Sequence, residues 1–292
     1  MNSATKTQPQ TVRILWTLIV IYAAARVLQV FPGKIPLLAI VALHVLPPMA
    51  FAVIHGAMLY RLRGMVTFIA ICLFAGNIFE NLGVRTGFPF GHYYFTDVMG
   101  PKIFAVPIFL GLAYVGMAYL SWTLGALILG GLGTPLCGHR VVTLPLVASF
   151  IVVAWDLSMD PVWSTIMHAW IWRGGGAYFG VPVSNFLGWY FTVYVIYQCF
   201  ALYLRGRALP VNPLPPSYWP LAVLFYAASA AGNLLVAIPA ADVSVVSDAS
   251  GAQWKVSSII SASVLTSIFA MGTFTVIARA RIADAKANSS HS

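Results

Sequence analysis

The sequence predicts an all-α integral membrane protein, a bundle of about eight transmembrane helices with a short interfacial helix. Of its 292 residues, 60% are hydrophobic and only 8% are charged, whereas soluble domains carry about a quarter charged residues. Apolar runs of roughly 20 residues, the length that crosses a bilayer, recur along the chain. A net charge of +9 could indicate nucleic acid as a partner. The basic residues lie singly or in pairs between apolar runs, however, which favours membrane topology signals and no nucleic acid.

The apolar runs divide the chain into eight expected spans. In order, these are residues 12–31, 36–60, 64–82, 103–129, 141–160, 182–204, 218–239 and 257–278. Pro47-Pro48 predicts a kink in the second span, tolerable where neighbouring helices satisfy the freed carbonyls. No long linker interrupts the series. We therefore expect residues 1–292 to form a single polytopic domain, with residues 1–11 and 283–292 as flexible tails.

The basic residues also predict an orientation. Ten of the 16 Lys and Arg residues lie at the two ends of the chain or in the even-numbered loops, and five lie in the odd-numbered loops. Cytoplasmic loops carry the excess of Lys and Arg, so both termini should be cytoplasmic in a protein of the cytoplasmic membrane. Six of the seven acidic residues then fall on the outer half, and only Asp284 lies inside.

Two acids stand inside the predicted spans. Glu80 lies near the end of the third span, and Asp156 occupies a similar place in the fifth. The negative end of the helix dipole and the low dielectric both disfavour a charged carboxylate there, so a protonated group suited to general acid catalysis is expected. Ionisable residues inside membranes are functional by default. The alternative is that each acid pairs with a base or amide, and the candidates are Arg85, Arg173, Asn77 and Asn81.

Asp160 permits two interpretations. Pro161 follows it, and an Asp-Pro pair is typical of an N-cap and first turn, which predicts a short helix over Val162–Trp172. Capping would explain Asp160 completely, but its position one turn after Asp156 leaves a catalytic share equally open. The remaining acids on the outer half, Asp97, Asp242 and Asp248, resemble ordinary loop acids.

The histidines do not suggest a metal site. His92 follows Gly91 in a loop with polar neighbours, and a lone histidine is more often structural than a ligand. The histidines at positions 44, 55, 92, 139 and 168 form no His-x-x-His or His-x-x-x-His pair, so no metal is expected. His44 and His55, inside the second span, could face a site or make interhelical hydrogen bonds.

A weak internal repeat connects the two spans that carry the acids. Glu80 lies 24 residues before Phe104-Ala-Val-Pro107, and Asp156 lies 23 residues before Phe179-Gly-Val-Pro182. Each unit is an acid near a helix end, an aromatic and glycine-rich loop, and a Phe-x-Val-Pro sequence that opens the next helix. A parallel repeat of two helices would bring the two acids together at one depth.

Aromatic residues gather in the same two stretches. An interfacial belt accounts for part of this set, but rings beside buried acids can also stack on a polyene and stabilise a transient carbocation. Asn185 could hold a water molecule nearby. The set comprises Phe88, Phe90, Tyr93, Tyr94, Phe95, Trp155, Trp163, Trp170, Trp172, Tyr178, Phe179, Phe186, Trp189 and Tyr190.

Four blocks of residues carry a resemblance to a known family. They read Asn81-Leu-Gly-Val-Arg-Thr-Gly-Phe-Pro-Phe-Gly-His-Tyr-Tyr, Gly100-Pro-Lys with Val106-Pro, Trp155-Asp-Leu-x-x-Asp-Pro and Gly175-Gly-x-Tyr-x-Gly-Val-Pro-x-Ser-Asn-Phe-Leu-Gly-Trp. In these blocks, between about residues 76 and 192, the chain resembles the membrane-integral carotenoid 1,2-hydratases. The first two and last two spans support the resemblance only by hydropathy.

The resemblance implies addition of water to the terminal C1=C2 double bond of an acyclic carotenoid, with no cofactor and no metal. Asp156 or Glu80 would protonate C2, the other acid with Asp160 and His92 would orient it or relay protons, and Asn185 would place the water. The substrate would contact Trp155, Tyr93, Tyr94, Phe90, Tyr178, Arg85, Asn81 and Trp189. The expected partners are a carotenoid within the bilayer and membrane lipids, with a homo-oligomer or contacts to other pathway enzymes left open.

Three other classes of protein remain as alternatives. A retinal protein would need a lysine within a span, but Lys34, Lys102 and Lys255 all lie at span ends, and a non-catalytic carotenoid-binding protein would gain nothing from buried acids. A transporter could use Glu80 and Asp156 as a proton relay. An isoprenoid cyclase would capture the same cation with a neighbouring double bond. Sequence alone does not separate a hydratase from a cyclase, because both need an acid and aromatic walls.

Overall fold

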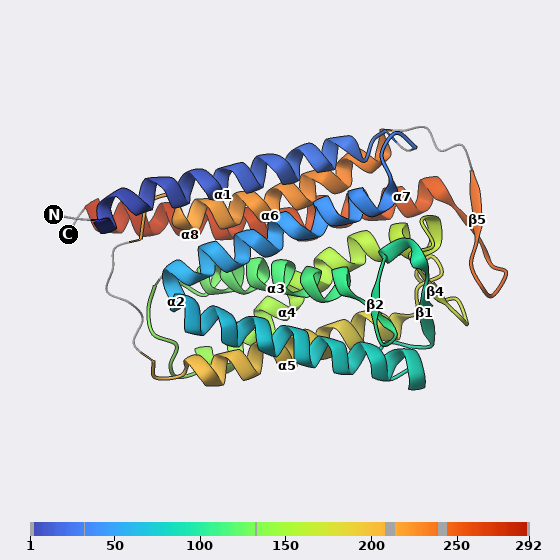
Figure 1. The fold of residues 1–292 in the computed structure, drawn as a ribbon, viewed down its shortest axis with the longest axis horizontal. Helices are drawn as coiled ribbons and strands as arrows, with labels where there is room; N and C mark the ends of the chain where they lie inside the picture. Colours follow the sequence, from blue (N-terminus) through green and yellow to red (C-terminus); the bar gives the residue numbers. More distant parts are fainter. Residues whose placement is uncertain (1–2, 32, 132, 208–213, 239–243, 291–292) are drawn as a thin grey trace.

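The computed structural model describes residues 3–31, 33–131, 133–207, 214–238 and 244–290, and it is a bundle of long helices (Figure 1). Seven helices in this part of the chain are long and apolar enough to cross a membrane, which confirms the predicted all-α membrane class. The helices are α1 (Ser3–Leu28), α2 (Leu37–Thr86), α3 (Ile108–Ile128), α4 (Arg140–Pro161), α5 (Val183–Leu204), α6 (Tyr218–Leu234), α7 (Val256–Thr266) and α8 (Gly272–Ser290).

Helix α2 contains two of the expected spans. It has 50 residues, and its backbone leaves the helical region at Arg61, where φ is 58° and ψ is 170°. The chain reverses there, so residues 37–60 and 62–86 form two limbs that run in opposite directions (Figure 1). The expected kink at Pro47-Pro48 is not where the helical backbone breaks. Instead, α3 packs closely on this pair, because a Cβ at Gly116 would lie 3.0 Å from Pro48.

The ends of the chain are helical where the structure describes them. Helix α1 begins at Ser3 and α8 ends at Ser290, and the flexibility of the two tails stays a prediction. Helices α7 and α8 are joined by a π-helical turn, Ser267–Met271, into one continuous rod. Asp242 lies outside the described residues.

Short strands at one end of the bundle were not expected from the sequence. Strand β1 (Tyr93–Phe95) pairs antiparallel with β4 (Trp170–Trp172), and Tyr94 stands opposite Ile171. Two further pairs are β2 (Lys102–Ile103) with β3 (Val106–Pro107), and β5 (Val245–Ser247) with β6 (Gln253–Lys255). We call the end of the bundle that carries β1 and β4 the site end. The start of α1, the end of α8 and the reversal in α2 lie at the opposite end (Figure 1).

The expected short helix over Val162–Trp172 is absent from the structure. The helix of α4 continues through Pro161 into a π-helical turn, Val162–Ile166, and residues 170–172 form β4. Trp170 and Trp172 are both buried, as period-two alternation in a strand allows. Pairing with β1 stabilises strand β4, and no local signal in the sequence indicates that pairing.

The weak internal repeat corresponds to two similar structural units. Unit 1 is the second limb of α2, its following loop and α3, and unit 2 is α4, its following loop and α5. Phe104 and Phe179 both adopt left-handed backbone angles, with φ of 55° and 53°. Pro107 and Pro182 are the N-caps of α3 and α5. The β1–β4 pair joins the loops of the two units.

Candidate active site

Three buried acids lie together at the site end, and we call Glu80, Asp156 and Asp160 the acid cluster. Their exposed fractions are 3%, 0% and 1%, and the three carboxyl groups are close enough to interact electrostatically. Glu80 comes from the second limb of α2, and the two aspartates lie one turn apart on α4. A cavity of about 20 Å³ lies beside them. Its lining is Glu80, Phe90, Tyr93, Phe95, Leu110, Met159, Asp160, Trp170, Trp172, Asn185 and Trp189.

Two tyrosines hold the carboxyl group of Glu80. The Tyr114 hydroxyl donates to Oε1 at 2.6 Å, and the Tyr93 hydroxyl donates to Oε2. Burial and the neighbouring Glu80 carboxyl raise the pKa of Tyr93 well above its ordinary value, so this phenol keeps its proton and remains a donor. Glu80 is therefore fixed at both oxygens, an arrangement that stabilises a carboxylate able to accept a proton.

An amide links the two aspartates of the cluster. Asn185 Nδ2 donates to Asp160 Oδ2 at 2.5 Å and to Asp156 Oδ2 at 3.2 Å. Trp170 Nε1 donates to Asp160 Oδ1 at 3.0 Å. Asp156 Oδ1 is buried and has no hydrogen-bond partner among the described residues. Asp156 is thus the least stabilised of the three acids as an anion, and Asp160 is the member of the pair that reaches the cavity.

No cation neutralises the acid cluster within the described residues. Among the described residues, one ion pair is present. It joins Lys102 Nζ to Asp97 Oδ1 at 3.1 Å, in an exposed loop. The predicted counter-charges, Arg85 and Arg173, are both exposed, and the Arg173 guanidinium lies 5.3 Å from the Tyr94 ring centre. Burying an unpaired charge costs far more than burying a neutral group. The alternative in which the acids serve only as ion-pair partners is therefore wrong for this site.

Several predicted site residues do lie at the cavity. Glu80, Asp160 and Asn185 line it, together with the rings of Phe90, Tyr93 and Trp189. Two other predicted residues stand behind these walls. The Trp155 ring packs edge-on against Trp189 with centroids 6.3 Å apart, and the Tyr178 hydroxyl donates to Leu157 O at 3.2 Å.

Four predicted residues do not meet the acid cluster. His92 is exposed, and its ring lies over Gly87, where a Cβ would come within 2.9 Å of it. Tyr94 is 42% exposed, because it stands on the outward side of β1 between two inward residues. Arg85 is exposed on the last turn of α2. None of these three residues lines the cavity, and their roles in catalysis or substrate binding stay predictions.

The fourth residue, Asn81, has a supporting position. Its Nδ2 donates to Asn77 O at 2.9 Å, and its Oδ1 accepts from the Ala105 amide at 3.2 Å. Asn81 therefore ties the end of α2 to the turn between β2 and β3. Neither Asn77 nor Asn81 bonds to Glu80, contrary to the alternative considered from the sequence.

Asp160 belongs to the acid cluster, whereas Asp248 has a structural role in a loop. Asp160 does not cap a helix, because α4 continues through Pro161, and its carboxyl group points into the cluster. Asp248 holds the turn between β5 and β6. Burial alone would raise the pKa of Asp248, but hydrogen bonds from Ser250, Trp254 and the Ala252 amide hold it below its ordinary value.

Sequence reasoning missed Tyr114, which contacts both Glu80 and the predicted ring of Trp189. The Tyr114 and Trp189 rings stack with centroids 4.5 Å apart and planes 11° apart. The internal repeat contained the missing signal. Tyr114 lies seven residues after Pro107, and Trp189 lies seven residues after Pro182. Trp170, Trp172 and Phe95 also line the cavity, although the sequence placed them only in the aromatic set.

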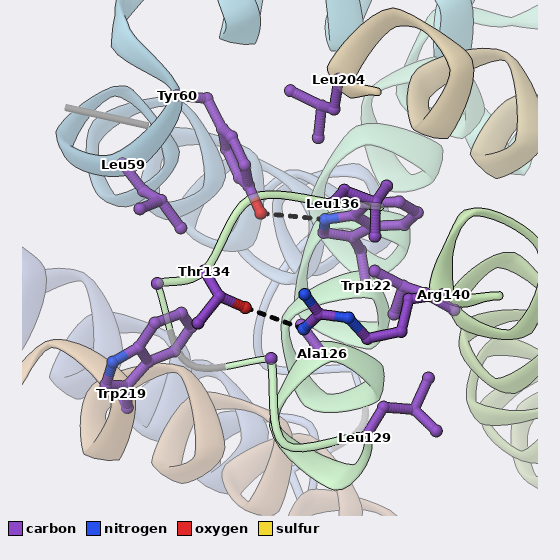
Figure 2. Close-up of a pocket in the computed structure, with 13 residues that line it drawn as sticks. Leu59, Tyr60, Trp122, Ala126, Leu129, Thr134, Leu136, Arg140, Leu204 and Trp219 are labelled. Carbon is purple, nitrogen blue, oxygen red and sulfur yellow. Dashed lines mark hydrogen bonds between the residues drawn. The ribbon is translucent and has the colours of Figure 1, made fainter. Parts of the chain in front are cut away.

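Three other hollows are present among the described residues. A groove of about 520 Å³ between the second limb of α2 and α3 reaches Glu80 and Tyr114. A hollow of about 170 Å³ at the site end is lined by Ser164, Thr165, His168, Asp248 and others, and shares the Trp172 ring with the acid cavity. At the opposite end, a small cavity contains the Tyr60–Trp122 and Thr134–Arg140 hydrogen bonds but no acid (Figure 2).

The histidines inside α2 do not join the cluster. His55 bonds through Nδ1 to the Tyr119 hydroxyl at 2.6 Å and through Nε2 to Tyr218 O at 2.8 Å, which is an interhelical role. His44 packs beside Tyr22 and Trp163. In the described ranges, no three His, Cys, Asp or Glu residues are grouped so as to hold a metal ion. That the site works without a metal or cofactor stays a prediction.

Comparison with known proteins agrees with the motifs. Over 178 residues the chain is 30% identical to a protein of Haloarcula japonica named bisanhydrobacterioruberin hydratase, and the alignment covers 55% of this chain and 58% of that protein. No solved structure was found to match. Residues 36–247, which contain the whole acid cluster, match a family described as "Carotenoid biosynthesis protein". The chain therefore belongs to the carotenoid biosynthesis protein family.

Proposed function

We propose that this protein adds water to the terminal C1=C2 double bond of an acyclic carotenoid end group, giving a tertiary alcohol at C1. Family membership and a relative named as a hydratase support a carotenoid-modifying enzyme. The observation that carries the finer proposal is the acid cluster itself, with three buried carboxyl groups, no cation beside them among the described residues, and a cavity walled by aromatic rings.

The aspartate pair is the proposed proton source. Two carboxyl groups this close in buried surroundings do not both ionise, so the pair retains a proton. Asp156 and Asp160 accept hydrogen bonds from the same amide, Asn185 Nδ2, and they share this proton. Asp160 lines the cavity and donates the proton there. Transfer of the proton to C2 breaks the π bond and leaves a tertiary cation at C1. Trp189 and Phe90 line the cavity, and their rings would stabilise that cation by cation–π attraction.

Glu80 is the proposed proton acceptor. A cavity of about 20 Å³ has room for about one water molecule. When the oxygen of this water bonds to C1, one of its protons passes to Glu80, whose two oxygens are oriented by Tyr93 and Tyr114. The product gains one water in total, and transfer of the proton from Glu80 back to the aspartates restores the site. The hollow lined by Ser164, Thr165 and His168 shares Trp172 with the cavity, and it is the proposed route for the next water.

The proposal is tested with lycopene, an acyclic carotenoid, in cells that accumulate it and produce this protein. We expect a product heavier by one water. When membranes that hold unlabelled lycopene are isolated from these cells and incubated in heavy water, the product should carry one carbon-bound deuterium, at C2. Glu80→Gln, Asp156→Asn and Asp160→Asn should each lower the rate about 10²–10⁴-fold, the usual contribution of general acid–base catalysis.

Asp97→Asn is the matched control, since it makes the same change at an exposed acid outside the cluster. It should hydrate lycopene at the wild-type rate. A product that carries one deuterium but no added water would identify a cyclase and overturn hydration. Normal turnover by all three cluster variants would remove the site.

A further inference from the structure

The groove between the second limb of α2 and α3 connects the outer surface of the bundle with the acid cluster. Its walls include four apolar side chains that are between 38% and 51% exposed, Leu73, Ile78, Ile103 and Ile108. Glu80 and Tyr114, which are hydrogen-bonded to each other, also line the groove. The outer surface here is the apolar face of two helices long enough to cross a membrane. The groove therefore opens where lipid would surround the protein.

Two glycines keep this groove open. Gly76 and Gly111 both line it, one on each helix. A Cβ at Gly76 would lie 3.5 Å from the Tyr114 ring, and a Cβ at Gly111 would lie 3.2 Å from Leu73 Cδ2. Any larger side chain at either position would occupy the space in front of the acid cluster.

Unit 2 has no such pair of glycines. Aligning Phe104 with Phe179 places Phe186 at the position of Gly111, and aligning Glu80 with Asp156 places Val152 at the position of Gly76. Phe186 is 8% exposed and Val152 is 1% exposed, so both fill their positions. The turn of unit 2 is also covered, because the Phe179 ring contacts Trp254 at 5.6 Å between centroids, whereas Phe104 is 80% exposed. The opening belongs to unit 1 and does not follow from the repeat.

We propose that this groove is the substrate-binding site for the acyclic polyene chain, which enters from the bilayer and brings its end group to Glu80. The inference rests on the proposed function. A long hydrocarbon chain would expose apolar surface to water if it approached through an aqueous opening, and a lateral groove avoids that exposure. Apart from Asn77, the groove is lined by apolar residues up to Glu80 and Tyr114, so it suits an acyclic polyene whose far end remains in lipid.

Three variants test the groove. Leu73→Trp places a large ring in its wall, and Gly111→Phe copies the residue that fills unit 2. Val66→Trp is the matched control, because Val66 lies seven residues before Leu73 on the same limb, is 56% exposed and does not line the groove. Each protein is purified in detergent from cells that accumulate lycopene. The retained lycopene is measured by its visible absorption and induced circular dichroism, and folding is checked by thermal unfolding.

We expect Leu73→Trp and Gly111→Phe to retain at least tenfold less lycopene than the wild type and to raise KM more than they lower kcat. Val66→Trp should match the wild type. Retention by folded Leu73→Trp equal to that of Val66→Trp would overturn the groove, as would a wild-type protein that retains no lycopene. A third outcome separates the two proposals. If the wild type retains lycopene without hydrating it, and Leu73→Trp no longer retains it, then the groove binds the polyene and the hydration proposal fails.

Discussion

Tyr93 and Tyr94 are neighbours in β1 with opposite surroundings. Tyr93 is 2% exposed and donates its hydroxyl to Glu80, while its ring packs against Trp172 with centroids 4.8 Å apart. Tyr94 is 42% exposed and lies beneath the Arg173 guanidinium. Because side chains alternate along a strand, one residue orients the acid cluster and the next contacts the surface. The pair offers an internal comparison of the same chemical change at two adjacent positions.

Tyr93→Phe should lower the rate of lycopene hydration, and Tyr94→Phe should leave it within twofold of the wild type. A hydrogen bond to a charged group contributes about 1.5–3 kcal/mol, so removing the Tyr93 hydroxyl should slow turnover about 10- to 100-fold. The ring remains in both variants, so packing is preserved. Hydration rates in isolated membranes measure the difference. Equal rates for the two variants would mean that the Tyr93 hydroxyl does not act on Glu80.

The sequence identified some site residues because their polarity is conspicuous in apolar surroundings. Glu80, Asp156 and Asn185 each lie within or beside a membrane-length helix, where any polar group needs an explanation. The inward or outward direction of loop residues such as His92 and Tyr94 could not be predicted. That direction depends on the pairing of β1 with β4, a contact between segments far apart in the chain.

At the scale of elements, a short series of polar contacts holds α1 against α6. Arg26 donates to Asn233 Oδ1, and Tyr22 donates to Ser229 Oγ at 3.1 Å. Gly232 allows this close approach, because a Cβ at that position would lie 1.9 Å from Arg26 Nε. Helix α1 therefore packs on α6 only while position 232 has no side chain.

Gly232→Ala should lower the thermal stability of the protein, since forcing an extra methyl group into a packed contact costs about 1–3 kcal/mol. Gly174→Ala is the control, because a Cβ there would meet nothing within 4 Å. Thermal unfolding in detergent, followed by tryptophan fluorescence, compares the two variants with the wild type. If Gly232→Ala and Gly174→Ala melt at the same temperature, then the α1–α6 contact can absorb the methyl group.

Hydropathy predicted the spans well because every residue of a span obeys the same requirement for an apolar side chain. The segment after Asp160 shows where local signals fail. Pro161 resembles a helix start, yet α4 runs through it, and Met167 N donates to Val162 O at 2.9 Å as the π-helical turn closes. Residues 170–172 then join a strand whose partner lies in unit 1. The pairing of β4 with β1 therefore outweighed the local preference of Asp160-Pro161 for a helix start.

At the scale of the whole molecule, the two ends of the bundle are expected to face opposite sides of the membrane. Cys137 is exposed in the loop between α3 and α4, at the end of the bundle where α1 begins and α8 ends (Figure 1). Asp97 lies in an exposed loop at the site end. The excess of Lys and Arg assigns the end with Cys137 to the cytoplasm, so the acid cluster lies toward the outer leaflet. This orientation stays a prediction.

Cysteine labelling measures the orientation directly. In a protein with Cys72 and Cys199 replaced by alanine, a membrane-impermeant maleimide should modify Cys137 in inverted vesicles but not in intact cells. With Cys137 also replaced, Asp97→Cys should react in intact cells. The opposite pattern of labelling would reverse the orientation and place the acid cluster near the cytoplasmic surface.

The cavity beside the acid cluster is about 20 Å³ in volume, which limits the number of water molecules that can react with the substrate. A space of that size holds about one oxygen nucleophile, and aromatic rings form much of its lining. A carbocation formed beside this space would meet a single partner in a fixed direction. Each end group would then give one regioisomer, and dehydration of the alcohol would retrace the same path.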